Sequence, residues 1–105
     1  MEQPNLIYIK SMSGGNQAFE QKLIGIIKQE FPKEVEIYLT NMSLKEYRKA
    51  ADNVHKLKHK ISILGLQKSY AIAQDYEKNL LEGSTILEAD FSDIIRLIAD
   101  FLETQ

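Results

Sequence analysis

The segment Tyr47–Gly65, with the sequence YRKAADNVHKLKHKISILG, decides the fold class of this chain. Its apolar residues recur at alternating spacings of three and four, as on the face of an α-helix that packs lengthwise against other helices. Gly65 follows the last apolar position, as glycine commonly does at the end of a helix. The segment therefore predicts a long amphipathic helix. Its apolar positions are Tyr47, Ala50, Val54, Leu57, Ile61 and Leu64.

The preceding part of the chain repeats this helical pattern. Asn16 is a good N-cap, and apolar residues recur from there to Asn41. Pro32 interrupts the run, and since proline kinks or breaks a helix interior, we expect either one kinked helix or two helices end to end. Ser43-Leu44-Lys45-Glu46 has the S-x-x-E form of a capping box. It predicts that the central helix begins at Ser43.

Two further helices are expected after Gly65. The first closes at Gly83, and after a short connection, Ser84 to Ala89, the second is capped by Asp90. Before Gly14, a short helical turn is favoured over a strand, which would have no partner. We therefore expect one all-α domain over residues 1–105. It consists of an N-terminal segment, 1–15, with a short helix, and an antiparallel four-helix bundle, 16–105.

The composition excludes several classes of function. The chain has 105 residues and a net charge of −2, with its charges scattered, so we expect no nucleic-acid partner. It has no cysteine, which excludes disulfides, thiolate zinc sites and thiol catalysis. No apolar run approaches the roughly 20 residues of a membrane span, and no secretory signal is recognisable. We expect a cytoplasmic monomer without direct membrane contact.

The chain's two histidines, His55 and His59, both lie on the predicted central helix and point away from its apolar face. Three hypotheses follow. The two histidines could be ordinary solvated side chains, a pair of metal ligands, or a nucleophilic site. A zinc site needs about three or four protein ligands, and a carboxylate such as Asp52 would have to complete it. A neutral imidazole attacks phosphorus readily, and Lys58, one turn on, would compensate the charge of a phosphoryl group.

The sequence His55-Lys56-Leu57-Lys58, followed by Ser62 and Leu64-Gly65, resembles the signature H-x-L-K-G-x-x-x-x-x-G of histidine-containing phosphotransfer (HPt) domains. Residues 26–42, with their interior proline, and the pair Tyr76-Glu77 are also similar to parts of that family. The resemblance covers about residues 6–83. It implies a four-helix bundle that accepts a phosphoryl group from the aspartate of a receiver domain and passes it to another aspartate.

The resemblance also implies roles for individual residues. His55 would accept the phosphoryl group, and Lys58 would pair with its oxygens. Glu77 would accept a hydrogen bond from the other ring nitrogen and orient the imidazole, a role that Gln74 could share. No cofactor is expected in this domain, since Mg²⁺ would belong to the receiver. The partners would be receiver domains of response regulators or of a hybrid sensor kinase, of which this chain could be a part.

The main departure from the signature is His59, which stands where the family usually has glycine. Its side chain would contact the receiver, contact the phosphoryl group, or have no role. Ser62 is expected to touch the phosphoryl group or to form a small rim beside it. Ala51 and Leu44 are expected to lie exposed in the docking face. The alternative function is a helical docking module that binds a receiver or kinase without phosphotransfer.

Overall fold

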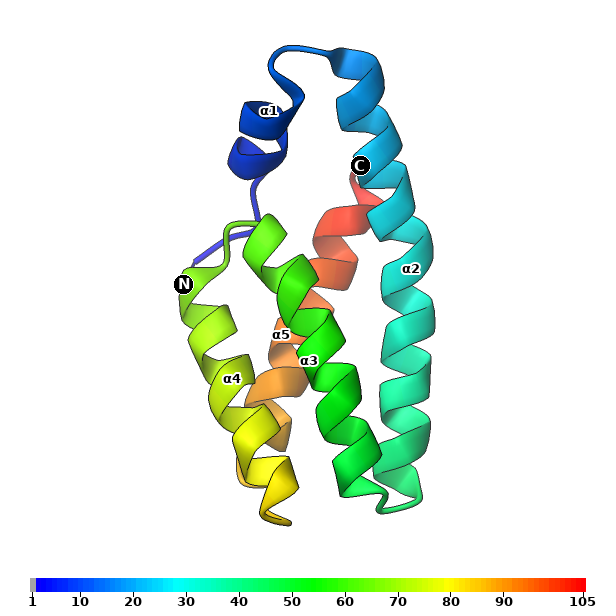
Figure 1. Cartoon of the computed structure of the whole chain (residues 1–105), viewed down its shortest axis with the longest axis vertical. Coiled ribbons are helices and arrows are strands. Elements are labelled where there is room, and N and C mark those ends of the chain that lie inside the picture. The colour runs from blue at the N-terminus through cyan, green and yellow to red at the C-terminus, as the bar shows by residue number, and fades with distance from the viewer. Residues whose placement is uncertain (1) are drawn as a thin grey trace.

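The computed structural model describes residues 2–105. Met1, part of the expected N-terminal segment, lies outside the described residues. These residues form five helices and no strand, so the all-α prediction is confirmed for them (Figure 1). The helices are α1 (Ile7–Ser13), α2 (Gln17–Ser43), α3 (Tyr47–Ile63), α4 (Gln67–Leu81) and α5 (Glu88–Glu103).

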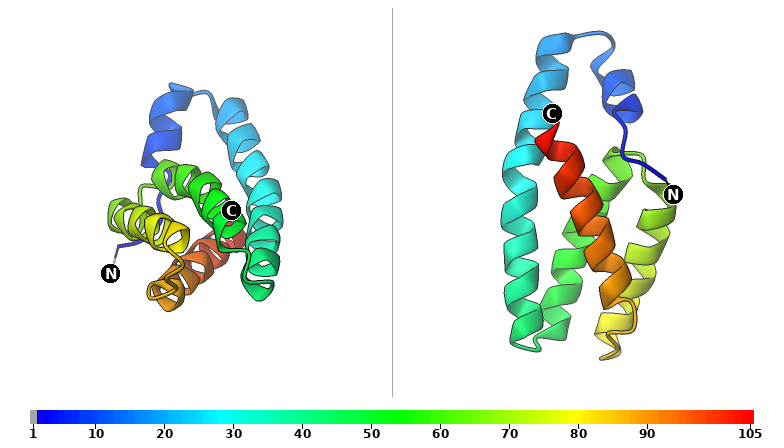
Figure 2. Two further views of the ribbon diagram at one scale, coloured as in Figure 1. Left: turned by 60° about the horizontal axis from the view of Figure 1, so that its bottom comes forward. Right: turned by 180° about the vertical axis from the view of Figure 1, so that it is seen from behind.

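The four longer helices lie side by side, and the chain reverses direction at each connection between them (Figure 1). The histidine-bearing helix α3 packs most extensively against α4 and α2. From behind, α5 is seen to cross the space between α2 and α4 (Figure 2), and it packs more closely on α4. A helix as long as α2, with 27 residues, spans about 40 Å, which accounts for most of the 44 Å long axis.

The apolar face of α3 forms the centre of the core, as its spacing predicts. Val54, Leu57 and Ile61 are at most 1% exposed, and they belong to one core cluster with apolar side chains of α2, α4 and α5. Burial of such a continuous face against several helices supplies most of a helix's stability in a protein. The same burial fixes the opposite face of α3 toward solvent, and that face carries both histidines.

Helix α2 is one continuous helix through Pro32, so the prediction of two separate helices is wrong. Proline removes one backbone hydrogen bond, but Pro32 is exposed while Phe31 and Tyr38 stay anchored in the core. At the start of α2 the predicted cap is confirmed. The Asn16 side chain accepts a hydrogen bond of 3.0 Å from the Phe19 backbone N–H.

The capping box predicted at Ser43 is wrong. Ser43 is the last residue of α2, and its hydroxyl donates to the Thr40 carbonyl. Lys45 adopts a positive φ of 57°, and the Glu46 N–H donates to the Asn41 carbonyl at 2.8 Å. These bonds satisfy the last carbonyls of α2 and form a C-terminal cap. Helix α3 therefore begins later, at Tyr47, without a side-chain cap.

The predicted capping role of Asp90 is also wrong. Helix α5 begins at Glu88, and the residue at its N-cap position is Leu87. Asp90 lies within the first turn together with Glu88, where a negative charge still interacts favourably with the helix dipole. The connection expected as Ser84 to Ala89 thus ends two residues earlier, because apolar Leu87 packs against the core at the entrance to the helix.

Gly65 terminates the α3 segment, as predicted, in a left-handed conformation with a φ of 77°. A Cβ at this position would lie 2.6 Å from Nδ2 of Asn5, so the N-terminal segment leaves no room for a side chain there. The Asn5 backbone N–H donates to the Leu64 carbonyl at 2.9 Å. These contacts tie the chain before α1 to the turn between α3 and α4.

Glu2 fixes the same N-terminal segment to the start of α4. Its carboxylate accepts hydrogen bonds from the backbone N–H groups of Lys68, at 3.0 Å, and Ser69, at 2.6 Å. Burial acts to raise the pKa of Glu2, but the hydrogen bonds from Ser69 and Lys68 outweigh it and lower the pKa. The carboxylate therefore caps α4 from a distant part of the chain.

Replacing Glu2 by glutamine is expected to destabilise the fold by about 0.5–1 kcal/mol at neutral pH, the usual worth of a helix cap. Because the folded-state pKa is lowered, this stabilisation is present above the ordinary pKa of 4.5 and is lost as the pH falls through the folded value. Urea denaturation at several pH values measures the difference. Glu36→Gln, at an exposed position of α2, is the control; an E2Q deficit that persists unchanged in acid contradicts the prediction.

Candidate functional site

His55 lies in the middle of α3, and its side chain is 55% exposed. Its neighbours along the helix, Val54 and Leu57, are fully buried, so the packing of α3 determines which way the histidine points. The ring is therefore presented on the protein surface by a rigid element of the core. This agrees with the outward orientation predicted from the helical periodicity.

Glu77 on α4 faces the His55 ring, as the resemblance to HPt domains implies. Nδ1 of His55 lies 3.1 Å from Oε2 and 3.3 Å from Oε1 of the carboxylate. An ionised carboxylate can only accept hydrogen bonds, so Nδ1 is assigned as the protonated nitrogen. Nε2 then keeps its lone pair, and within residues 2–105 it has no hydrogen-bond partner. In a neutral ring held in this way, Nε2 is the nitrogen available to act as a nucleophile.

The surroundings of Lys58 differ from those expected for a lysine that pairs with a phosphoryl group on His55. Its ammonium group lies 2.9 Å from Oε1 of Glu77 and 5.5 Å from the centre of the Tyr70 ring, and its side chain is only 11% exposed. The lysine side chain thus extends toward α4, where its ammonium group contacts Glu77 and Tyr70. Glu77 consequently binds both His55 and Lys58. The pairing of Lys58 with phosphoryl oxygens stays a prediction.

His59 is exposed and lies one turn beyond His55 on α3. The two imidazole rings are in contact, with centres 5.4 Å apart and planes at 89°, an edge-to-face arrangement. The structure therefore places a second ring directly beside the candidate nucleophile, at the position where the HPt signature has glycine.

The remaining predicted site residues are not all exposed as expected. Ser62 is exposed and lines a hollow between α1 and the α3–α4 turn, together with Tyr8 and Tyr70. Gln74 is exposed on α4, and in the described residues the His55 ring donates its hydrogen bond to Glu77, not to Gln74. The expected exposure of Ala51 is wrong: it is 2% exposed and part of the core. Leu44, in contrast, is 65% exposed.

Two features near the site were missed by sequence reasoning. Tyr70 of α4 has its aromatic ring against the Lys58 ammonium group. Lys60 is 8% exposed, and its Nζ lies 3.1 Å from a carboxylate oxygen of both Glu30 and Glu34 on α2. The one available signal was the four-residue spacing of Glu30 and Glu34, which puts both on one face of a helix.

Beneath the site, two tyrosine hydroxyl groups are buried together. Tyr38 of α2 and Tyr76 of α4 are hydrogen-bonded at 2.6 Å, and the Tyr76 hydroxyl also donates to the Met42 sulfur at 3.7 Å. Burial raises the pKa of both tyrosines above the ordinary value of 10. Tyr76 directly precedes Glu77, so this buried pair anchors the part of α4 that carries the carboxylate.

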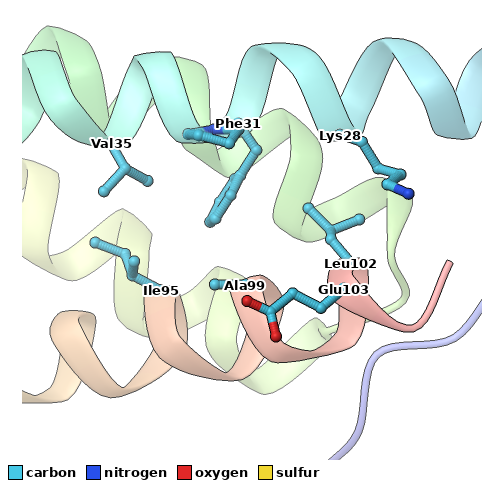
Figure 3. A pocket seen from close by; sticks show the side chains of 8 residues that line it. Lys28, Phe31, Val35, Ile95, Ala99, Leu102 and Glu103 are labelled. Atoms are coloured by element: carbon cyan, nitrogen blue, oxygen red, sulfur yellow. The ribbon is translucent and has the colours of Figure 1, made fainter.

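A separate apolar groove lies between α2 and α5 and is shown in Figure 3. Its volume of about 370 Å³ is near the lower end of the range for small-molecule pockets. None of the site residues predicted from the sequence lines it. The lining residues are Lys28, Phe31, Pro32, Val35, Ile95, Ala99, Leu102 and Glu103.

Comparisons with protein-family models, with curated proteins and with solved structures found no match to this chain. Within residues 2–105, no helix is long and apolar enough to cross a membrane. In the same part of the chain, no three His, Cys, Asp or Glu side chains are grouped so that they could hold a metal ion. The functional conclusion therefore depends on the residues and the geometry described above.

Proposed function

We propose that this chain is a phosphorelay intermediate of the HPt type, which receives a phosphoryl group on His55 from the aspartate of a receiver domain and passes it to another receiver. Its fold would be the antiparallel four-helix bundle of that class, a proposal supported by the reversal of direction at each connection between the long helices (Figure 1). The observation that carries the proposal is the exposed imidazole whose Nδ1 is held by Glu77.

The proposed transfer needs only the lone pair of Nε2. The lone pair attacks the phosphorus of the receiver's aspartyl phosphate, an N–P bond forms, and the P–O bond breaks. The aspartate leaves as a carboxylate with the electron pair of that bond. The His55 ring keeps its Nδ1 proton and becomes a phosphorylated imidazolium. Mg²⁺, held by the receiver, would neutralise charge on the phosphoryl oxygens during transfer.

Glu77 contributes in two ways to this reaction. Before transfer its carboxylate holds the proton on Nδ1, which leaves Nε2 free to attack. During transfer positive charge develops on the ring, and a carboxylate 3.1 Å from Nδ1 stabilises that charge. Lys58, 2.9 Å from the same carboxylate, limits its negative charge and fixes its position. The return reaction to a second aspartate is the same sequence in reverse.

The partners in this proposal are receiver domains, and the domain works in the cytoplasm as a monomer or as part of a larger kinase. The test is incubation with a panel of receiver domains that have been phosphorylated with acetyl phosphate and Mg²⁺. We expect an acid-labile phosphoryl group on His55 in the wild type and none in His55→Gln, a variant that is matched in polarity. A chain that binds a phosphorylated receiver but acquires no label instead supports the docking module without phosphotransfer.

A further inference from the structure

The structure raises the question of which side chain would hold the phosphoryl group once it is bound to His55. Lys58 is engaged elsewhere, because its ammonium group is paired with Glu77 and lies over the Tyr70 ring. The Lys58 side chain is also only 11% exposed. The signature lysine is therefore already paired within the domain.

His59 differs from Lys58 both in its exposure and in its contacts. It is exposed, it has no hydrogen-bond partner within residues 2–105, and its ring is in contact with the His55 ring. Residues four positions apart on a helix are neighbours on its surface. Imidazole always carries at least one N–H donor, in its neutral as well as its protonated form. A phosphoryl group on Nε2 would thus find a donor one turn away.

Glycine at this position would leave the phosphoryl group without such a neighbour, so the histidine changes the chemistry of the site as well as its shape. We propose that His59 donates a hydrogen bond to the phosphoryl group on Nε2 of His55 and prolongs its lifetime there. This inference rests on the proposed function of His55 as phosphoryl acceptor. It assigns to His59 the direct contact that the signature assigns to Lys58.

Phosphoramidate tests the inference without any receiver. The Nε2 lone pair attacks its phosphorus, an N–P bond to His55 forms, and the P–N bond of the donor breaks with loss of ammonia. The half-life of phosphorylated His55 is then measured in wild type, His59→Ala and His59→Gln. A hydrogen bond to a charged group corresponds to an effect of about 10- to 100-fold, so we expect the half-life to fall by at least about 10-fold in H59A. Glutamine, which retains an N–H donor, should restore most of it.

A second measurement distinguishes a direct contact of His59 with the phosphoryl group from a purely structural role. The ³¹P resonance of the phosphoryl group should titrate at a higher pH in H59A than in wild type, because a nearby donor favours the dianion. Lys56→Ala, an exposed neighbour of His55 on another face of α3, is the matched control and should change neither readout. Circular dichroism checks that each variant retains its helices.

The outcomes distinguish the inference from the proposed function. Labelling of His55 with the same half-life and the same ³¹P titration in H59A overturns the role of His59 alone. The same conclusion follows if Lys58→Met changes both readouts while H59A changes neither. If His55 acquires no phosphoryl group from phosphoramidate or from any phosphorylated receiver, both the inference and the proposed function are overturned.

Discussion

Glu77→Ala is expected to slow phosphoryl transfer to His55 by about 10- to 100-fold, the effect found when a carboxylate that orients a metal-bound histidine is removed. Without the carboxylate the ring is free to place its proton on Nε2, which removes the nucleophile. The imidazolium formed in the transfer also loses its counter-charge, which lies 3.1 Å away in the structure. Single-turnover transfer from a phosphorylated receiver measures the effect.

Glu77→Gln is the matched control for this prediction. Its amide oxygen can still accept from Nδ1–H, but it carries no charge to stabilise the imidazolium or to pair with Lys58. We expect a transfer rate between those of wild type and E77A. Both variants leave Lys58 without its anionic partner, so thermal denaturation should accompany the rates. A rate for folded E77A that is within twofold of wild type would contradict the orienting role.

Leu57→Ala is expected to cost about 3 kcal/mol in the free energy of unfolding. Leu57 is fully buried in α3, which packs against both α2 and α4, so truncation would leave a cavity where three helices meet. Buried leucine-to-alanine changes cost about 2–5 kcal/mol through lost transfer free energy and cavity formation. Since domains of this size are stable by only about 5–15 kcal/mol, such a loss is a large part of the total.

Urea denaturation followed by circular dichroism measures this cost. Leu44→Ala is the control, because Leu44 has the same side chain but is 65% exposed. Its expected change is within about 0.5 kcal/mol. Equal losses in the two variants would show that the apolar face of α3 does not form the centre of the core.

The regular parts of the fold were predictable because they depend on local chemistry and on periodicity. The spacing from Val54 to Ile61 defined the buried face of α3, and Asn16 and Gly65 marked helix ends through side-chain capping and a positive φ. The prediction failed at Ser43, where two caps competed. There the C-terminal cap of α2 was formed, and the capping box of α3 was not.

For most residues of the candidate site, the sequence correctly predicted which face of its helix each occupies; the exception is Ala51, which is buried. The direction of Cβ follows from the helical period, and it placed His55 and His59 outward. The end of a long side chain does not follow from that direction. Lys58 and Lys60 both carry their ammonium groups to partners on neighbouring helices, at positions that depend on tertiary packing. Their burial therefore became visible only in the structure.

All the groups of the candidate site lie between residues 55 and 77, on two helices joined by the tight turn at Gly65. This has a consequence for folding kinetics. Contacts between segments close in sequence require little loop-closure entropy, and proteins rich in them fold fast. The α3–α4 hairpin can assemble before α5, which packs less extensively, is added. We therefore expect His55 and Glu77 to come together early, in the part of the chain that folds first.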